Sequence, residues 1–149
     1  MTTSENLAGP ADAPASQAWM LLIARVLLAP LFLYSGTGKV LAFGYTASRL
    51  PGGAEGFGAL LTAGSIAVEL GCGLAVLLGL FARPAAALLI PFTIAATLMF
   101  HNFWAAPEAQ VTAQTINFLK NLGLIGLMGL IATFGPGPFA VRARPEMRR

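Results

Sequence analysis

The chain has 149 residues, of which 56% are hydrophobic and only 10% charged. An ordinary soluble domain is about 25% charged, so these side chains cannot coat a water-soluble body of this size, whereas a lipid-facing surface needs no charge. The formal charge of +3 does not indicate nucleic-acid binding, because a basic tail beside a membrane segment more often sets topology or touches anionic lipid. The last eight residues hold four of the arginines: Arg142, Arg144, Arg148 and Arg149.

The first seventeen residues are rich in Ala, Pro, Ser and Thr, and they carry Glu5 and Asp12 without any Lys or Arg. This composition predicts a disordered lead over residues 1–17. A secretory signal is not indicated, because Arg25 interrupts the apolar run that begins at Trp19 and the start lacks positive charge. We therefore expect no cleavage here.

Four apolar segments follow, each near the roughly 20 residues that cross a hydrocarbon core of about 30 Å as a helix. Because a backbone in lipid must satisfy its own hydrogen bonds, the segments predict an all-α integral membrane protein, a four-helix transmembrane bundle. They are Ala18 to Leu41, Gly58 to Leu80, Ala85 to Trp104, and Phe118 to Phe134. The first could instead lie on the membrane surface as an amphipathic helix, but a span is favoured because its charges lie toward its two ends.

The connections between the segments predict how the helices are arranged. Residues 81–84 are so few that they force an antiparallel hairpin, with Pro84 suited to opening the next helix. The turn-rich residues 42–57 and the polar residues 105–117 should then lie together on the opposite side of the membrane.

The cations flanking the spans predict the orientation of the chain. The side that holds both termini carries Arg83 and the four tail arginines, against three cations on the other side: Lys39, Arg49 and Lys120. The positive-inside rule therefore predicts that both termini are cytoplasmic.

Two cations share one face of the first helix. On a helical wheel Arg25 and Lys39 lie on one stripe with Ala29, Phe32 and Gly36. A charge at the bilayer centre costs about 2.5–3.5 kcal/mol on insertion scales, so the stripe is predicted to face the bundle interior.

Glu69 lies near the middle of the second apolar segment and is its one charged residue. A carboxyl at this depth must find a cation, find a donor or stay protonated, and we expect Arg25 as its first candidate partner and Lys39 as the next. Two interpretations stay open: a pair that only joins helices, and a functional group that accepts a proton beside a redox carrier. Cys72, the only cysteine, is predicted to be an inert small hydrophobe.

The last two helices supply three further polar candidates. His101 ends the third helix, and a lone His at a membrane border is more often a hydrogen-bonding residue than a metal ligand, so we predict no metal site. Lys120 and Asn121 lie near the start of the fourth helix, and the Asn121 amide needs partners there. Lys39, His101, Lys120 and Asn121 are predicted to share one membrane edge, where they could form one site. A glycine ridge follows that predicts a helix-packing face: Gly123, Gly126 and Gly129.

From Arg25 to Gly137 these residues, in this order, resemble the DoxX family of four-helix bacterial membrane proteins. The resemblance rests on three pieces of sequence: the run from Arg25 to Lys39; Glu69-Leu70-Gly71 followed by Gly79-Leu80 and Arg83; and Phe118-Leu119-Lys120-Asn121 leading to Gly135-Pro136-Gly137. It implies a membrane domain over residues 18–137, followed by a basic tail over 138–149. The family commonly continues into a Ser-Leu-Asp type ending, which Pro138 and Phe139 replace here. The matching polar positions are Arg25, Lys39, Glu69, Lys120 and Asn121.

The resemblance also implies a link to redox chemistry, since the family takes its name from relatives of a thiosulfate:quinone oxidoreductase subunit. We therefore expect an accessory subunit of a quinone- or thiol-linked system in the cytoplasmic membrane, binding a quinone-like ligand and a soluble redox partner. The alternatives are a non-catalytic scaffold or assembly factor, and a small transporter acting as a homo-oligomer. Catalysis by this chain alone is not indicated, because it lacks a redox cysteine pair, a phosphate loop and a Ser-His-Asp set.

Overall fold

The computed structural model describes residues 15–141. The predicted lead before Ala15 and the tail from Arg142 lie outside the described residues. Within them the elements are helices and turns, which confirms the all-α prediction. The helices in chain order are α1 (Ala15–Leu41), α2 (Phe43–Ser48), α3 (Phe57–Leu78), α4 (Ala82–Phe100), the short 3-10 helix η1 (Phe103–Ala105) and α5 (Glu108–Phe134).

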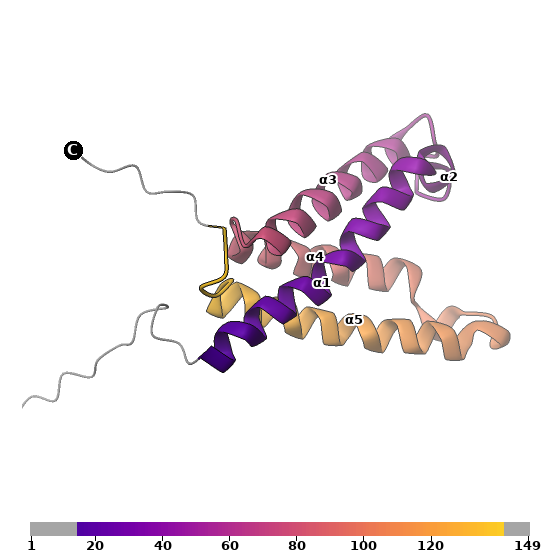
Figure 1. Cartoon of the computed structure of the whole chain (residues 1–149). Helices are drawn as coiled ribbons and strands as arrows, with labels where there is room; N and C mark the ends of the chain where they lie inside the picture. Colours follow the sequence, from indigo (N-terminus) through magenta and orange to yellow (C-terminus); the bar gives the residue numbers. More distant parts are fainter. Residues whose placement is uncertain (1–14, 142–149) are drawn as a thin grey trace, which may run out of the picture.

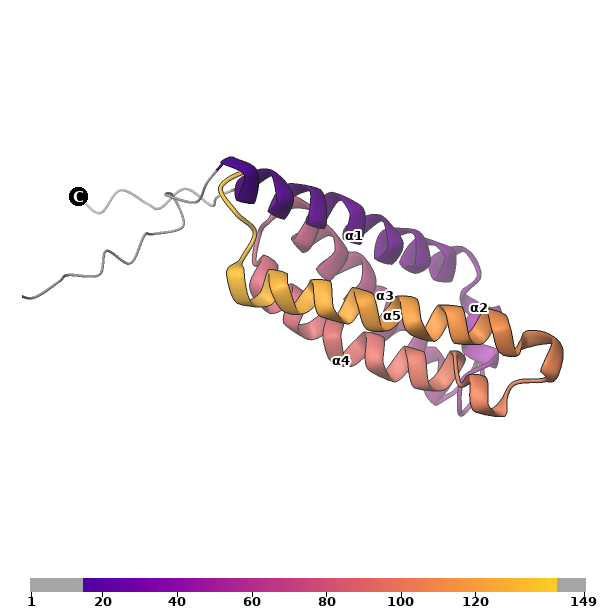
Figure 2. The same cartoon turned by 90° about the horizontal axis from the view of Figure 1, so that it is seen from below.

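Four of these helices are long and apolar enough to cross a membrane: α1, α3, α4 together with η1, and α5. They form two closely packed pairs, α1 with α3 and α4 with α5, which are joined mainly through α3 and α4. Figure 1 shows the pairs meeting near the start of α1 and the end of α5, and diverging toward α2 and η1. Figure 2, seen from below, shows α1 and α5 running along the length of the same bundle. The predicted four-helix bundle is therefore confirmed, with one closed end and one open end.

The predicted spans match α1, α3 and α4 to within a few residues, but the last helix differs. It begins at Glu108, not at Phe118, so most of the connection expected over residues 105–117 is helical. Hydropathy measures the tendency to enter lipid, so the polar first turns of α5 do not register on it although they are helical. The first helix also begins earlier than predicted, at Ala15, within the stretch expected to be a disordered lead.

Close glycine contacts set α1 against α3. A Cβ at Gly36 would lie 2.8 Å from the Leu70 side chain and 3.2 Å from that of Glu69. A Cβ at Gly73 would lie 3.2 Å from Phe32 Cβ. The two antiparallel helices therefore approach closely along this line, and the predicted stripe of α1 faces the interior, since Arg25, Ala29, Phe32 and Gly36 are all buried.

Arg25 closes the end of the bundle near the termini. Its side chain has no exposed surface, and it donates to the carbonyl oxygens of Leu77 at 3.3 Å and Phe139 at 3.2 Å. The backbone amide of Val141 donates to the Leu78 carbonyl at 2.8 Å, so residues 139–141 lie across the C-terminal end of α3. A guanidinium there meets free carbonyl groups and the negative end of the helix dipole. The prediction that Arg25 pairs with Glu69 is wrong.

The glycine ridge of α5 does not pack inside the bundle. A Cβ at Gly123, Gly126 or Gly129 would meet nothing within 4 Å among the described residues. The buried side chains of α5 are instead Met128 and Ile131. The prediction that these glycines form a packing face is wrong within the monomer, because other residues of α5 make its buried surface.

Candidate functional site

An ion pair lies inside the bundle between α1 and α3. Lys39 Nζ is 2.5 Å from Glu69 Oε2, and Ser35 Oγ donates to Glu69 Oε1 at 2.9 Å. Lys39 Nζ also lies 3.4 Å from Ser35 Oγ, so the three side chains form one small network. The Glu69 side chain is 5% exposed and that of Lys39 is 25% exposed. The carboxylate is thus held by two donors in a setting with little solvent.

The positions of Lys39 and Glu69 follow from the end of α1 and from its close contact with α3. Lys39 belongs to the last turn of α1, where a cation is favoured by the helix dipole. Ser35 lies one turn before it on the same face. Gly36 lets α3 come close at this level, so the short Glu69 side chain reaches both donors. The sequence did not single out Ser35, although its spacing of four from Lys39 was a usable signal.

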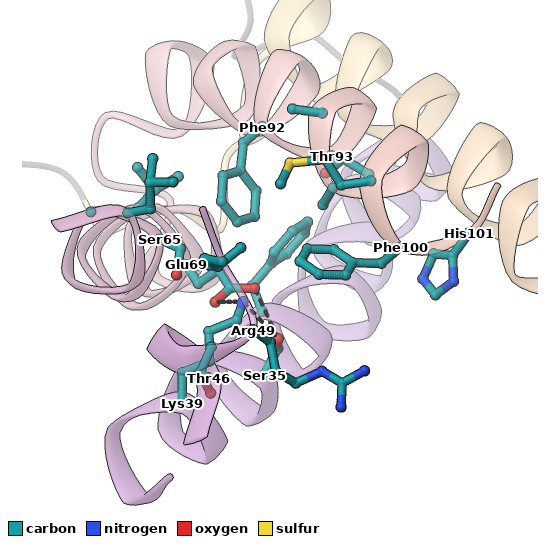
Figure 3. A pocket seen from close by; sticks show the side chains of 18 of the residues that line it. Ser35, Lys39, Thr46, Arg49, Ser65, Glu69, Phe92, Thr93, Phe100 and His101 are labelled. Carbon is teal, nitrogen blue, oxygen red and sulfur yellow. Dashed lines mark hydrogen bonds and ion pairs between the residues drawn. The ribbon is translucent and has the colours of Figure 1, made fainter. Parts of the chain in front are cut away.

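The network borders a cavity of about 760 Å³, a size typical of small-ligand sites. All of the long helices and α2 contribute to its wall, and Figure 3 shows the polar network on one side with aromatic rings beside it. Its lining comprises Leu31, Phe32, Ser35, Lys39, Tyr45, Thr46, Arg49, Leu50, Leu60, Leu61, Gly64, Ser65, Val68, Glu69, Phe92, Thr93, Ala95, Ala96, Met99, Phe100, His101 and Asn121.

Most of that wall is apolar, and several of its members also face outward. Leu31 is 46% exposed, Leu60 is 69% exposed and Met99 is 50% exposed. These positions belong to helices that are long and apolar enough to span a membrane, so their outer surfaces suit contact with acyl chains. The Lys39 ammonium lies over the face of the Phe92 ring, with Nζ 5.7 Å from the ring centroid, so a cation–π interaction stabilises the charge. The cavity is thus an apolar space with a few polar groups, bordered by exposed apolar side chains.

The wall made by α4 and α5 carries its own hydrogen bonds. Asn121 Nδ2 donates to Thr97 Oγ1 at 2.8 Å, and Thr97 Oγ1 donates to the Thr93 carbonyl at 2.6 Å. His101 Nδ1 lies 2.8 Å from Gln114 Oε1. Asn121 therefore has the partner that its position inside a helix requires. Gln114 belongs to the first part of α5, which was predicted to be a connection, and its contact with His101 comes from this extra length of helix.

The six candidate residues do not form one group. Lys39, Glu69, His101 and Asn121 all line the cavity. Lys120 is exposed and outside the lining, because it points about 100° around α5 from its neighbour Asn121. Arg25 lies at the closed end, bonded to carbonyls.

The short helix α2 shapes the open end of the cavity and was not predicted from the sequence. Tyr45, Thr46 and Arg49 line the cavity from α2 and its C-terminal cap. Arg49 Nη1 donates to the Tyr45 hydroxyl at 3.1 Å, and its guanidinium lies 5.6 Å from the Tyr45 ring centroid. Gly58 permits close contact of α3 with the backbone of α2, since a Cβ there would collide with the Ala47 carbonyl. Six residues are too few for helix periodicity to reveal.

The chain is similar to one protein family and to two inner membrane proteins of Escherichia coli. The DoxX family model matches residues 20–102, which run from α1 through α4. Inner membrane protein YphA of Escherichia coli (strain K12) is 29% identical over 133 residues, covering 89% of this chain and 95% of that protein. Inner membrane protein YqjF of the same organism is 32% identical over 122 residues, covering 81% and 88%. No solved structure matches the chain.

Proposed function

The chain belongs to the DoxX family, and from this premise we propose that it is an accessory subunit of a membrane redox system whose cavity binds a quinone-like ligand. Its four apolar helices and its inner membrane relatives support a multi-pass protein of the cytoplasmic membrane. The observation that carries the proposal is the Lys39–Glu69 pair, which borders a cavity within the spanning helices.

A pair that served packing alone would be expected to be enclosed by other side chains. Burying two charges is expensive, and a pair of apolar side chains often joins helices as well or better. Here Lys39, Glu69 and Ser35 leave an apolar space of about 760 Å³ beside them. An apolar pocket with a few converging polar groups is the usual form of a small-molecule site. This contrast favours ligand binding over a purely structural role.

The wall of the cavity favours a ligand with an apolar body that enters from the bilayer. Its exposed edges are apolar, among them Leu31, Leu60 and Met99. In this proposal the Lys39 ammonium, which has three hydrogens, donates to a polar head beside its contacts with Glu69 and Ser35, and Glu69 accepts a proton from a reduced one. A quinone-like molecule has this combination of apolar body and oxygen acceptors.

The redox centre would come from a separate soluble protein, since Cys72 is the only cysteine of the chain. The chain would then act as a membrane docking subunit, with both termini cytoplasmic as the cation distribution predicts. A homo-oligomer is compatible with this role, and the open glycine face of α5 is available for it.

The proposal is tested by quinone binding to the purified protein in mild detergent. The probe is a 1,4-benzoquinone with a decyl tail, measured by equilibrium dialysis. Glu69→Ala and Lys39→Ala should each weaken binding by at least tenfold, because each removes a charged group from the site. Lys120→Ala is the matched control, since that lysine is exposed and outside the cavity. Absence of binding by the parent, or unchanged binding by both cavity variants, would reject the proposal.

A further inference from the structure

Thr93 is an unusual threonine among those of the spanning helices. Its side chain is only 4% exposed and its hydroxyl oxygen has no hydrogen-bond partner among the described residues. Four other threonines donate to the carbonyl four residues earlier, which is the ordinary way to satisfy a hydroxyl in a helix. These are Thr62, Thr97, Thr115 and Thr133. Because an unpaired buried hydroxyl costs about 1–3 kcal/mol, its partner has to come from elsewhere.

Thr93 lines the cavity on the wall opposite the ion pair. Ser35, Lys39 and Glu69 belong to the α1–α3 pair, whereas Thr93 belongs to α4. Figure 3 shows Thr93 across the cavity from this network, with Phe92 and Phe100 nearby. Thr93 therefore brings a hydroxyl without a partner among the described residues to the α4 wall of the cavity.

The neighbouring polar groups on this wall are already engaged. Thr97 Oγ1 accepts from Asn121 and donates to the Thr93 carbonyl. His101 is bonded to Gln114 at the open end. Thr93 Oγ1 is the buried cavity-lining hydroxyl on α4 that remains free within the part of the chain that the structure describes.

We propose that Thr93 is a second ligand anchor, donating its hydroxyl hydrogen to an acceptor oxygen of a molecule whose other polar end lies against Ser35 and Lys39. This inference rests on the proposed ligand site and narrows its ligand class. The ligand has an apolar body and two acceptor oxygens on opposite sides of its head, as a 1,4-quinone has. It hydrogen-bonds to both helix pairs at the end where they diverge.

The test compares Thr93→Val, which keeps the shape and removes the hydroxyl, with Thr93→Ser, which restores a hydroxyl. The probe is again the decyl 1,4-benzoquinone. Thr93→Val should bind about fivefold to tenfold more weakly, as loss of one hydrogen bond predicts, and Thr93→Ser should recover most of the affinity. Thr62→Val is the control, because Thr62 is also buried but bonds to the Gly58 carbonyl and is outside the cavity lining.

The possible results separate this inference from the function on which it rests. If the parent binds the probe and Thr93→Val binds it equally well, Thr93 is no anchor, while the site at Lys39 and Glu69 stands. If Thr93→Val and Thr62→Val lose affinity together, the loss reflects folding and the inference fails. If the parent binds no probe, both the quinone-type function and the Thr93 anchor fail.

Discussion

Removing one member of the Lys39–Glu69 pair should have a strongly unequal effect, depending on which charge remains. Lys39→Met leaves the Glu69 carboxylate, whose side chain is 5% exposed, with Ser35 as its one remaining side-chain donor. An uncompensated buried charge costs about 3–5 kcal/mol, and the hydrogen bond from Ser35 offsets part of this cost. We therefore expect Lys39→Met to lower the free energy of unfolding by about 2–4 kcal/mol. Glu69→Gln leaves an ammonium that is 25% exposed in the last turn of α1, which can reach the membrane surface. Glu69→Gln should therefore lower the free energy of unfolding by only about 1 kcal/mol.

The assay is unfolding in mixed micelles with increasing SDS, followed by far-UV circular dichroism, on the two single variants and on Lys39→Met with Glu69→Gln together. The double variant has no unpaired buried charge, because it lacks both the ammonium and the carboxylate. It should therefore be more stable than Lys39→Met alone. Equal losses in the two single variants would refute the reasoning. So would a double variant whose loss is the sum of the two, because the side chains would then act independently.

Two further outcomes follow from the closed end and from the close contact of α1 and α3. Arg25→Met should release the chain after α5 and increase chymotryptic cleavage after Phe139 severalfold, whereas Arg83→Met, which removes one long exposed bond, should leave cleavage unchanged. Equal cleavage in parent and Arg25→Met would contradict this role. Gly36→Val should lower the free energy of unfolding by about 1–3 kcal/mol through overpacking against α3, and Gly38→Val, with open space around it, should change it by less than about 0.5 kcal/mol. Similar losses in the two glycine variants would show that helix propensity, not contact, sets the effect.

The sequence predicts the number and order of the spans because each long apolar segment has one stable form in lipid, the helix. It fails where the first turns of a long helix are polar. The N-terminal turns of α5 contain Glu108, Gln110 and Gln114, which lower the hydropathy of that stretch without opposing a helix. A different limit hides α2, whose six residues are too few for a helical period to appear.

The partner of Glu69 could not be predicted from a helical wheel, because a wheel shows which face of a helix a residue occupies but not its position along the helix axis. Arg25 and Lys39 share a face of α1, but the contacts of Gly36 with Glu69 place that carboxylate at the level of Gly36. Arg25 is about 11 residues away, or about 16 Å along the axis, which a side chain cannot reach. Lys39 is one turn away. The connection over residues 42–57 is too long to set this register, so only the close approach at Gly36 and Gly73 could have indicated it.

The two cations on the inner face of α1 therefore have different roles at the two ends of the bundle. Arg25 has carbonyl partners, so its hydrogen bonds draw the chain after α5 onto α3 and close that end. Lys39 has a carboxylate partner and a partly exposed side chain, so its neighbourhood stays polar where the helix pairs diverge. Thr93 lines the same cavity from α4, so the cavity lies between the two helix pairs. A cation with carbonyl partners thus joins the chain after α5 to α3, whereas a cation with a carboxylate partner borders the cavity.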